Sequence, residues 1–488
     1  MKPLVKLHLN HAVRAVCLAS ALVVSSAATN AGTLDYLQGL LSSTPEGGWV
    51  QANTTSFSSV WASTDTSYGN AGAVVNAWSS FAWDSTGNQL LLWGGGHANY
   101  AGNEMYIWNG STGAWALGSL PSAMTTPTAS GASFVVDNAA PQSSHTYDNS
   151  VYLPINNMYL TFGGAAYNAG DVFQTNVNGV VQRAGPWLYD PTKASSTLVG
   201  GTTGSGVNTA AAGGNMWINR GTEIGFSENH VNGATAYRTE NGKDVVYVSM
   251  MSQGSGLPNL YRYTLGDVRN GGTDTWQLIG TTVNSYTQQA TATIDTAHNL
   301  FVRTAKPLSG TSLNSDLAVW NLSASGSGLI SDVGVQLYLT DGTRFSFQDG
   351  AGMDYDAATD TYYIYDGASP GVVYTTRAAF NANGTVATTW TVQKHVAATS
   401  STPLGNVLPS GSTGTGVNGK WQYVSALNAY INVDGMNSTN TDAGVWLYKP
   451  FSTSAAAPVP ENSTLALMLA GLGGLAWMSR RRSTAQTL

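Results

Sequence analysis

The chain has 488 residues, of which only 10% are charged, while 56 are glycine, 15 tryptophan and 23 tyrosine. This composition favours strands and turns over helices, and its many apolar residues exclude an intrinsically disordered chain. The formal charge is −7, and removing the six basic residues near the two ends takes it to −13: Lys2, Lys6, Arg14, Arg480, Arg481 and Arg482. A core this acidic has no electrostatic reason to bind nucleic acid or an anionic membrane surface.

Residues 1–31 have the three parts of a secretory signal peptide. A basic leader, "MKPLVKLHLNHAVR", precedes the apolar run "AVCLASALVV" and the small residues of "SSAATNAG". We expect cleavage near Ala28 or Ala31. The alternative is a membrane anchor, for which the apolar run is short. Cys17, the only cysteine, lies in this leader, so the exported protein has no disulfide, thiolate metal site or cysteine nucleophile.

Residues 33–453 contain repeated units of four predicted strands. The clearest is "AWSSFAWDSTGNQLLLWGGGHANYAGNEMYIWNGSTGAWALGSL", in which alternating apolar residues are separated by Gly, Asn and Ser turns. Weaker copies follow, and the last supplies only three strands. The stretch Glu46–Thr55 is expected to add the missing outer strand, which would hide the open edge of the last unit. The sequence therefore predicts an all-β fold: one β-propeller of six blades, with seven as the alternative.

These units resemble kelch repeats and the kelch-like propeller of the galactose oxidase group. The shared features are the doublets Gly94-Gly95 and Gly163-Gly164, Tyr106 in the third strand, and Trp115 and Trp276 in the fourth. The galactose oxidase cofactor requires a cysteine cross-linked to a tyrosine beside copper. Because the mature chain has no cysteine, we exclude a copper-radical cofactor, and we expect neither another cofactor nor a metal.

In this architecture, the loops that follow the second and fourth strands open on one face. The catalytic candidates there are His97, His145, Glu228 and His230, a set suited to acid–base work or metal binding. Further polar candidates for ligand binding are Asn99, Tyr100, Asn103, Tyr167 and Asp349, with Lys306 nearby. The alternative is structural, because polar side chains in such loops also tie one blade to the next.

Other chemistries find little support in the sequence. The acids of "DYDAATDTY" (Asp354–Tyr362) suit calcium, but the same spacing recurs in "AWDSTGNQL" and "TIDTAHNLF", which favours a hairpin turn. The repeated Ser-x-Asp-x-Gly boxes of sialidases are absent. A Gly-x-Ser-x-Gly elbow between a strand and a helix is absent as well.

The C-terminal segment has an apolar stretch from 463 to 479, followed by Arg480–Arg482. Its length is at the lower limit for a membrane-spanning helix, and the arginines would hold that end in the cytoplasm. A linker at 454–458 precedes the motif formed by Val459, Pro460, Glu461, Asn462 and Ser463. A plain single-pass anchor is one interpretation of this segment.

Together, the three parts of 459–482 resemble the PEP-CTERM sorting signal of Gram-negative bacteria that make exopolysaccharide. The usual motif has proline where this chain has Asn462. The resemblance implies recognition by a membrane exosortase, cleavage near the motif, and release or attachment at the cell surface or in the extracellular matrix. The chain would then contact the membrane only through its C-terminal helix before processing.

Two functions remain open at this point. The first is a matrix or surface module whose propeller binds a glycan or a matrix protein, which the aromatic, weakly charged composition favours. The second is a polysaccharide-acting enzyme, a lyase, hydrolase or epimerase. The discriminating question is whether His97, His145, Glu228 and His230 converge on one pocket. We favour the binding module.

Overall fold

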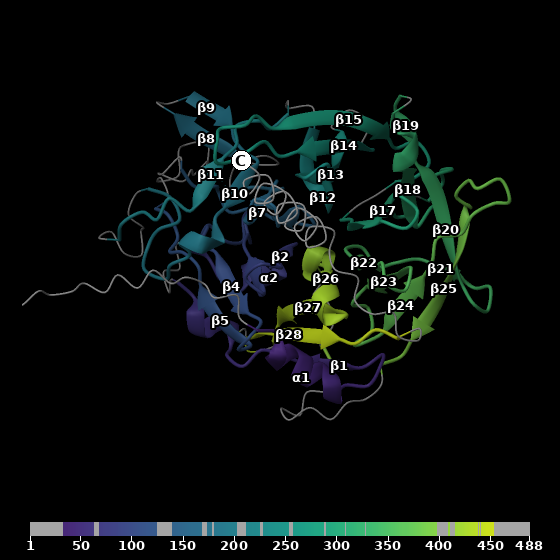
Figure 1. Cartoon of the computed structure of the whole chain (residues 1–488), viewed down its shortest axis with the longest axis horizontal. Helices are drawn as coiled ribbons and strands as arrows, with labels where there is room; N and C mark the ends of the chain where they lie inside the picture. The colour runs from purple at the N-terminus through teal and green to yellow at the C-terminus, as the bar shows by residue number, and fades with distance from the viewer. Residues whose placement is uncertain are drawn as a thin grey trace, which may run out of the picture.

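In the computed structural model, the described residues are 33–62, 68–123, 139–167, 173–177, 180–202, 211–224, 228–252, 257–286, 289–307, 309–326, 328–397, 408–409, 415–437, 439 and 441–452. They form an all-β molecule with a propeller-like arrangement of sheets (Figure 1). Helices are few and short, chiefly α1 (Asp35–Ser43) and α2 (Ala73–Asn76). No helix in this part of the chain is both long and apolar enough to span a membrane. The signal-peptide and sorting-signal predictions concern residues outside the described ranges.

The first three repeats form separate sheets with their strands in chain order, antiparallel except for one parallel pairing in the third. The first sheet holds β2 (Phe81–Asp84), β3 (Gln89–Leu92), β4 (Tyr106–Asn109) and β5 (Ala114–Leu117). The second holds β6 (Ser150–Leu153), β7 (Met158–Thr161), β10 (Trp187–Tyr189) and β11 (Trp217–Asn219), and β8 (Gln174–Val177) pairs with β9 (Val180–Arg183) outside it. The third holds β12 (Glu228–Glu240), β13 (Lys243–Ser252), β14 (Pro258–Thr264), β15 (Thr275–Thr281) and the short β19 (Ile330–Ser331), which pairs in parallel with β15.

The last sheet joins the two ends of the described chain. Its strands are β26 (Trp421–Val424), β27 (Ala429–Met436), β28 (Ala443–Tyr448) and β1 (Trp49–Gln51). β1 pairs antiparallel with β28, with Trp49 opposite Tyr448 and Gln51 opposite Trp446. The prediction that an N-terminal segment supplies the outer strand of the last unit is therefore confirmed.

The predicted number of blades, six with seven as the alternative, is wrong, because the described residues show four blades. The described residues form four separate sheets of four or five strands, and the stretches expected to give the fourth and fifth blades belong to one nine-stranded sheet. This sheet contains β16 (Ala292–Asp295), β17 (Leu300–Thr304), β18 (Leu317–Asn321), β20 (Val333–Leu339), β21 (Arg344–Phe345), β22 (Gly352–Asp356), β23 (Thr361–Tyr365), β24 (Val373–Thr376) and β25 (Thr389–His395). The two stretches merge because β20 and β25 pair in parallel, from Gln336 with Thr389 to Leu339 with Val392.

Local sequence explains the hairpins that begin the repeats. In the β2–β3 turn, the Asp84 carboxylate accepts hydrogen bonds from the backbone N–H groups of Thr86 and Gly87, at 2.9 and 2.7 Å. Asn88 then takes a left-handed conformation with φ 51°, which asparagine tolerates better than most residues. The turn between β22 and β23 has the same form, with Asp360 at φ 52°. The hairpin interpretation of Asp354–Tyr362 is thus confirmed.

The first strands of the repeats lie nearest the middle of the ring. β2, β12, β22 and β26 surround its centre in Figure 1. Successive inner strands contact one another, β2 with β6, β6 with β12, β12 with β16, β16 with β22, and β22 with β26. Gln422 of β26 closes the circuit, because its side-chain oxygen accepts from the Trp83 N–H at 3.2 Å and its amide donates to the Phe81 carbonyl at 2.6 Å.

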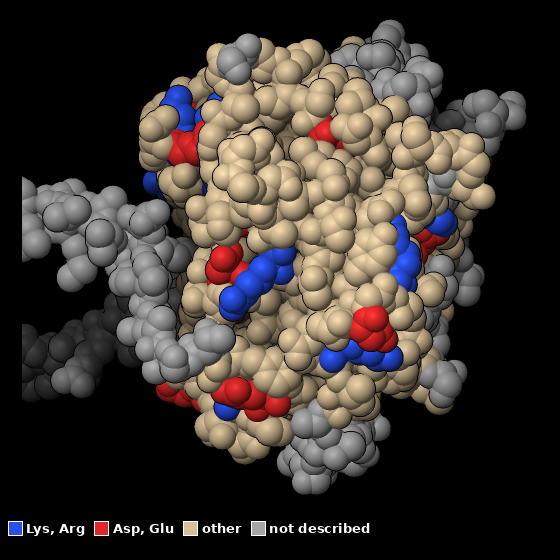
Figure 2. All heavy atoms as spheres, turned by 90° about the vertical axis from the view of Figure 1, so that its right-hand side faces the viewer, with Lys and Arg blue, Asp and Glu red and all other residues tan. Residues whose placement is uncertain are grey.

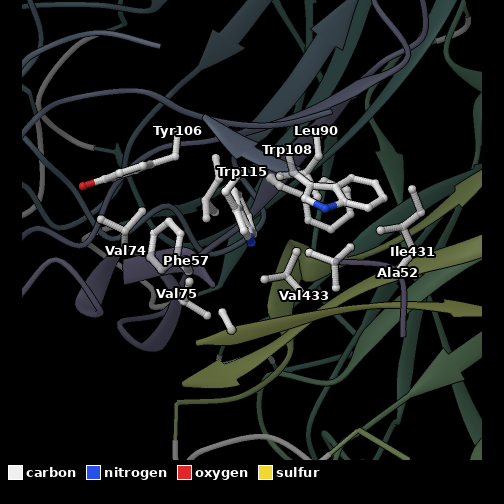
Figure 3. Close-up of a cluster of buried hydrophobic side chains, with 14 of the residues drawn as sticks. Ala52, Phe57, Val74, Val75, Leu90, Tyr106, Trp108, Trp115, Ile431 and Val433 are labelled. Carbon is white, nitrogen blue, oxygen red and sulfur yellow. The ribbon is translucent and has the colours of Figure 1, made fainter. Parts of the chain in front are cut away.

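Apolar side chains between neighbouring sheets form the core. In the cluster of Figure 3, Ile431 and Val433 of β27 face Leu90 and Trp108 of the first sheet, and all four are fully or almost fully buried. Burying an aliphatic or aromatic side chain of this size stabilises the fold by about 1.5–3 kcal/mol. Charged side chains are sparse on the surface, and Figure 2 shows several basic groups beside acidic ones on one side of the molecule.

Candidate functional site

A pocket with a volume of about 410 Å³ lies where four of the repeats meet. It is lined by Trp78, His97, His145, Tyr147, Ala165, Val231 and Gln289. These residues come from the segments that lead into β2, β6 and β16, the loops after β3 and β7, and β12 itself. A site at the ends of the inner strands of a ring is a common place for a small-molecule pocket, because several elements contribute side chains to it.

Four pocket residues have unusual backbone conformations. Trp78, His97, Tyr147 and Gln289 have φ values of 48°, 56°, 47° and 47°, in the left-handed region. All other described non-glycine residues with positive φ are asparagine or aspartate, which adopt this region at lower cost. A residue held in such a conformation costs on the order of 1–3 kcal/mol, and such residues cluster at functional sites. The strain in this fold is therefore concentrated at one pocket.

Three of these residues occupy equivalent positions in the repeats. Trp78, Tyr147 and Gln289 each lie three residues before the first residue of an inner strand, β2, β6 and β16 respectively. Backbone hydrogen bonds connect these turns: the Tyr147 N–H donates to the Trp78 carbonyl at 2.6 Å, and the Gly350 N–H donates to the Gln289 carbonyl at 3.0 Å. In these three repeats, the turn thus places one side chain at the end of the ring.

His145 forms part of an aromatic wall. Its ring centroid is 4.7 Å from that of Trp78 and 5.6 Å from that of His97. Its Nε2 lies 2.8 Å from the Asn99 side-chain oxygen. Burial, with a smaller contribution from the nearby His97, lowers the pKa of His145 to about 4. The imidazole is therefore neutral at pH 7 and suits an aromatic contact better than a charged one.

Of the other two catalytic candidates, His230 does not join this pair. His230 is 2% exposed, stacks on Phe162 at 5.2 Å, and has its Nε2 3.0 Å from a carboxylate oxygen of Glu223. Its neighbour Val231 lines the pocket instead. Glu228 is the first residue of β12, and its side chain lies outside the described part of the structure. The expected His/Glu cluster is thus reduced, among described side chains, to His97 and His145.

Most of the polar ligand-binding candidates hold the loops together. Asn103 is 2% exposed, and its amide donates to the Pro141 carbonyl at 2.8 Å. The Tyr100 hydroxyl bonds to the buried Glu104, and Lys306 pairs with Asp349. The Tyr167 backbone N–H donates to the Ser143 carbonyl at 2.8 Å.

None of these four candidates lines the pocket, whereas the fifth candidate, Asn99, acts there indirectly by holding His145. Asn103 and Tyr100 therefore fit the structural interpretation, in which polar side chains in these loops tie parts of the fold together. Asn99 is a positioning residue for the aromatic wall.

Sequence reasoning missed five of the seven pocket residues: Trp78, Tyr147, Ala165, Val231 and Gln289. Trp78 lies in the first repeat unit, whose first strand begins only at Phe81 in the structure. The available signal was positional. Trp78, Tyr147 and Gln289 each stand three places before an inner strand, but the significance of that position depends on the backbone conformation, which composition does not reveal.

A cluster of metal-ligand type lies in two hairpin turns of the nine-stranded sheet. Potential ligand atoms of Asp295, His298 and Asp360 all lie within 4.8 Å of one another. However, Tyr362 donates to Asp295 at 2.8 Å and Tyr355 donates to Asp360 at 2.7 Å. These hydrogen bonds and the 2.8 Å contact between His298 and Asp295 satisfy the three groups as a structural network.

Comparison with known proteins adds a likeness of fold alone. No protein-family model matches the chain, and no curated protein matches it. Among solved structures, the chain is similar to one described as "Structure of Dos1 propeller", at 10% identity, over 84% of this chain and 88% of that chain, with a TM-score of 0.29. A likeness this distant carries no argument about function, and the propeller-like arrangement is defined here by the sheets themselves.

Proposed function

We propose that this protein is an exported module, sorted to the cell surface or exopolysaccharide matrix by an exosortase, whose kelch-like propeller binds a glycan. The pocket at the ends of the inner strands is the proposed binding site. The observation that carries this proposal is the coincidence of strain and position: among the described non-glycine residues, the four left-handed ones that are neither asparagine nor aspartate all line that one pocket. Strain that the rest of the fold must offset is expected where a ligand is bound.

The chemistry of the lining supports binding over catalysis. The pocket offers the rings of Trp78 and Tyr147 and the amide of Gln289, a combination of aromatic surface and neutral hydrogen-bonding groups that suits a sugar. No carboxylate is among the lining residues in the described part of the chain. A hydrolase, lyase or epimerase needs a positioned acid or base, and the neutral, buried His145 is a poor acid at pH 7.

The test uses the full chain and the exopolysaccharide of the producing bacterium. Co-sedimentation measures binding, and the appearance of new chain ends in the same tube measures cleavage. We expect co-sedimentation without new chain ends, and a loss of at least tenfold in affinity in Trp78→Asn, which removes the ring and suits the left-handed turn. Trp276→Ala, a half-buried tryptophan of β15 outside the pocket, is the matched control and should bind normally.

Two results would count against the proposal. New chain ends that disappear in a His97→Ala variant would make the protein an enzyme. Absence of co-sedimentation by a folded wild-type chain would remove the glycan-binding function.

A further inference from the structure

We infer that the pocket selects uncharged sugar units and rejects acidic ones such as uronic acids. This inference rests on the proposed function and specifies its ligand class. It follows from three properties of the described residues: the lining carries no carboxylate, ammonium or guanidinium group, Arg303 and Asp148 beside it are engaged within the protein, and the amide of Gln289 offers uncharged hydrogen-bonding groups.

The lining residues provide no fixed charge. Of the seven, only the two histidines and Tyr147 ionise at all. Burial raises the pKa of Tyr147 to about 12, so its hydroxyl stays neutral, and His145 is neutral at pH 7 for the reason given above. An acidic sugar would lose part of the hydration of its carboxylate on entering and would gain no opposite charge, which makes its binding unfavourable.

Two charged side chains beside the lining segments, those of Arg303 and Asp148, are engaged within the protein. Arg303 is 1% exposed, and its two terminal nitrogens donate to the Ser249 hydroxyl at 2.7 Å and to the Asn232 carbonyl at 2.6 Å. Asp148, which follows Tyr147, accepts from the Ala292 N–H at 2.8 Å. Both groups therefore support the backbone behind the pocket, and neither is offered to a ligand.

The neutral groups are placed to recognise a sugar ring. Trp78, His145 and Tyr147 form a continuous aromatic surface, in which the His145 and Tyr147 rings meet edge to face at 6.1 Å. Within the described part of the chain, the side chains of His97 and Gln289 make no hydrogen bond, so both are available to sugar hydroxyls. Because the strained turns are fixed on folding, this surface is preorganised, which lowers the entropic cost of binding.

The experiment compares the binding of neutral and acidic glycans. The exopolysaccharide is divided by anion exchange into an unretained neutral fraction and a retained acidic fraction, and co-sedimentation with the full chain is measured for each. Two defined probes of equal length, cellohexaose and hexagalacturonate, are then titrated calorimetrically. We expect binding of the neutral fraction and of cellohexaose, with hexagalacturonate at least tenfold weaker.

A charge-introducing variant makes the inference sharper. Gln289→Lys places an ammonium group in the lining and should bind hexagalacturonate at least fivefold more tightly than wild type, with an effect that weakens at high salt. Gln289→Met is the matched control, because it has a similar length and no charge, and it should show no such gain.

The possible failures are distinguishable. Equal or tighter wild-type binding of the acidic fraction would overturn the inference and leave glycan binding intact. Neutral binding that survives Trp78→Asn unchanged would overturn it by locating the site elsewhere. If neither fraction binds, the proposed function fails and the inference fails with it.

Discussion

At the scale of single residues, the pocket contains side chains that are unfavourable for the left-handed backbone conformation at their positions. Gln289 has φ 47°, a conformation in which asparagine is more stable because its short polar side chain tolerates the left-handed region. The longer side chain of Gln289 instead lines the pocket, which is expected if the proposed ligand contacts its amide. Proteins commonly lose some stability at sites where function requires strain.

Replacement of Gln289 by asparagine tests this trade-off. Gln289→Asn keeps the amide, shortens it by one methylene, and should stabilise the protein by about 1 kcal/mol while weakening glycan binding. The converse control is Asn241→Gln, an exposed left-handed position (φ 50°) in the β12–β13 turn, which should destabilise by a similar amount and leave binding unchanged. Urea denaturation measures both. A less stable Gln289→Asn would contradict the strain argument.

His145 gives stability a specific dependence on pH. Its pKa is about 4 in the folded chain and about 6.5 when unfolded. Between these two pH values, His145 is therefore protonated in the unfolded state and neutral in the folded state. Stability is therefore lost as the pH falls from 6.5 towards 4, by about 2 to 3 kcal/mol from this residue. We expect His145→Gln to lack this loss.

The measurement is the difference in free energy of unfolding between wild type and His145→Gln at pH 7 and at pH 4.5. Buried carboxyls such as Asp148 and Asp354, whose pKa values burial raises, titrate in both proteins and cancel from the comparison. A difference that does not change with pH would refute the assignment.

At the scale of elements, the glycines that follow β3 and β7 explain how the pocket walls approach one another. A Cβ on Gly164 would lie 2.2 Å from the His145 carbonyl oxygen, and one on Gly96 would lie 2.2 Å from the Ser143 carbonyl oxygen. The loops after β3 and β7 therefore pack directly on the backbone of the segment that leads into β6. Only glycine permits this contact without displacing His145.

Gly164→Ala should consequently disturb the site as well as the fold. The added methyl group meets backbone rather than a flexible side chain, so we expect a loss of about 1–3 kcal/mol in stability together with weaker glycan binding. Gly39→Ala in α1 is the control, because nothing lies within 4 Å of its Cβ position, and it should be neutral or stabilising. Thermal unfolding and co-sedimentation test both, and unchanged binding in Gly164→Ala would count against the packing argument.

The elements also divide into those that sequence can predict and those it cannot. Hairpins such as β2–β3 and β22–β23 were predictable because Asp, Gly and Asn fix their turns locally. The β20–β25 pairing was not, since it joins segments about fifty residues apart and leaves no local pattern. His97 and His145 were found as polar loop residues, whereas Trp78 and Gln289 become recognisable only when several repeats are brought together.

At the scale of the whole molecule, the ring depends on the joint between its first and last strands. Trp49 of β1 is fully buried there, with its ring 5.1 Å from those of both Tyr365 and Tyr448 and 5.5 Å from that of Trp421. Its indole nitrogen donates to the Gly371 carbonyl at 2.9 Å. One side chain thus connects β1 to the last sheet and to the nine-stranded sheet beside it.

Truncation of this side chain should weaken the closed ring more than any exposed substitution. We expect Trp49→Ala to destabilise the protein by about 3–5 kcal/mol, the usual cost of removing a buried aromatic ring. Trp49→Phe keeps most of the apolar contact and loses the indole hydrogen bond, so about 1 kcal/mol should be lost from that bond. Chemical denaturation of both variants gives the comparison. If Trp49→Ala cost no more than Trp49→Phe, the joint would be held by the β1–β28 backbone pairing, and the aromatic cluster would contribute little to closure.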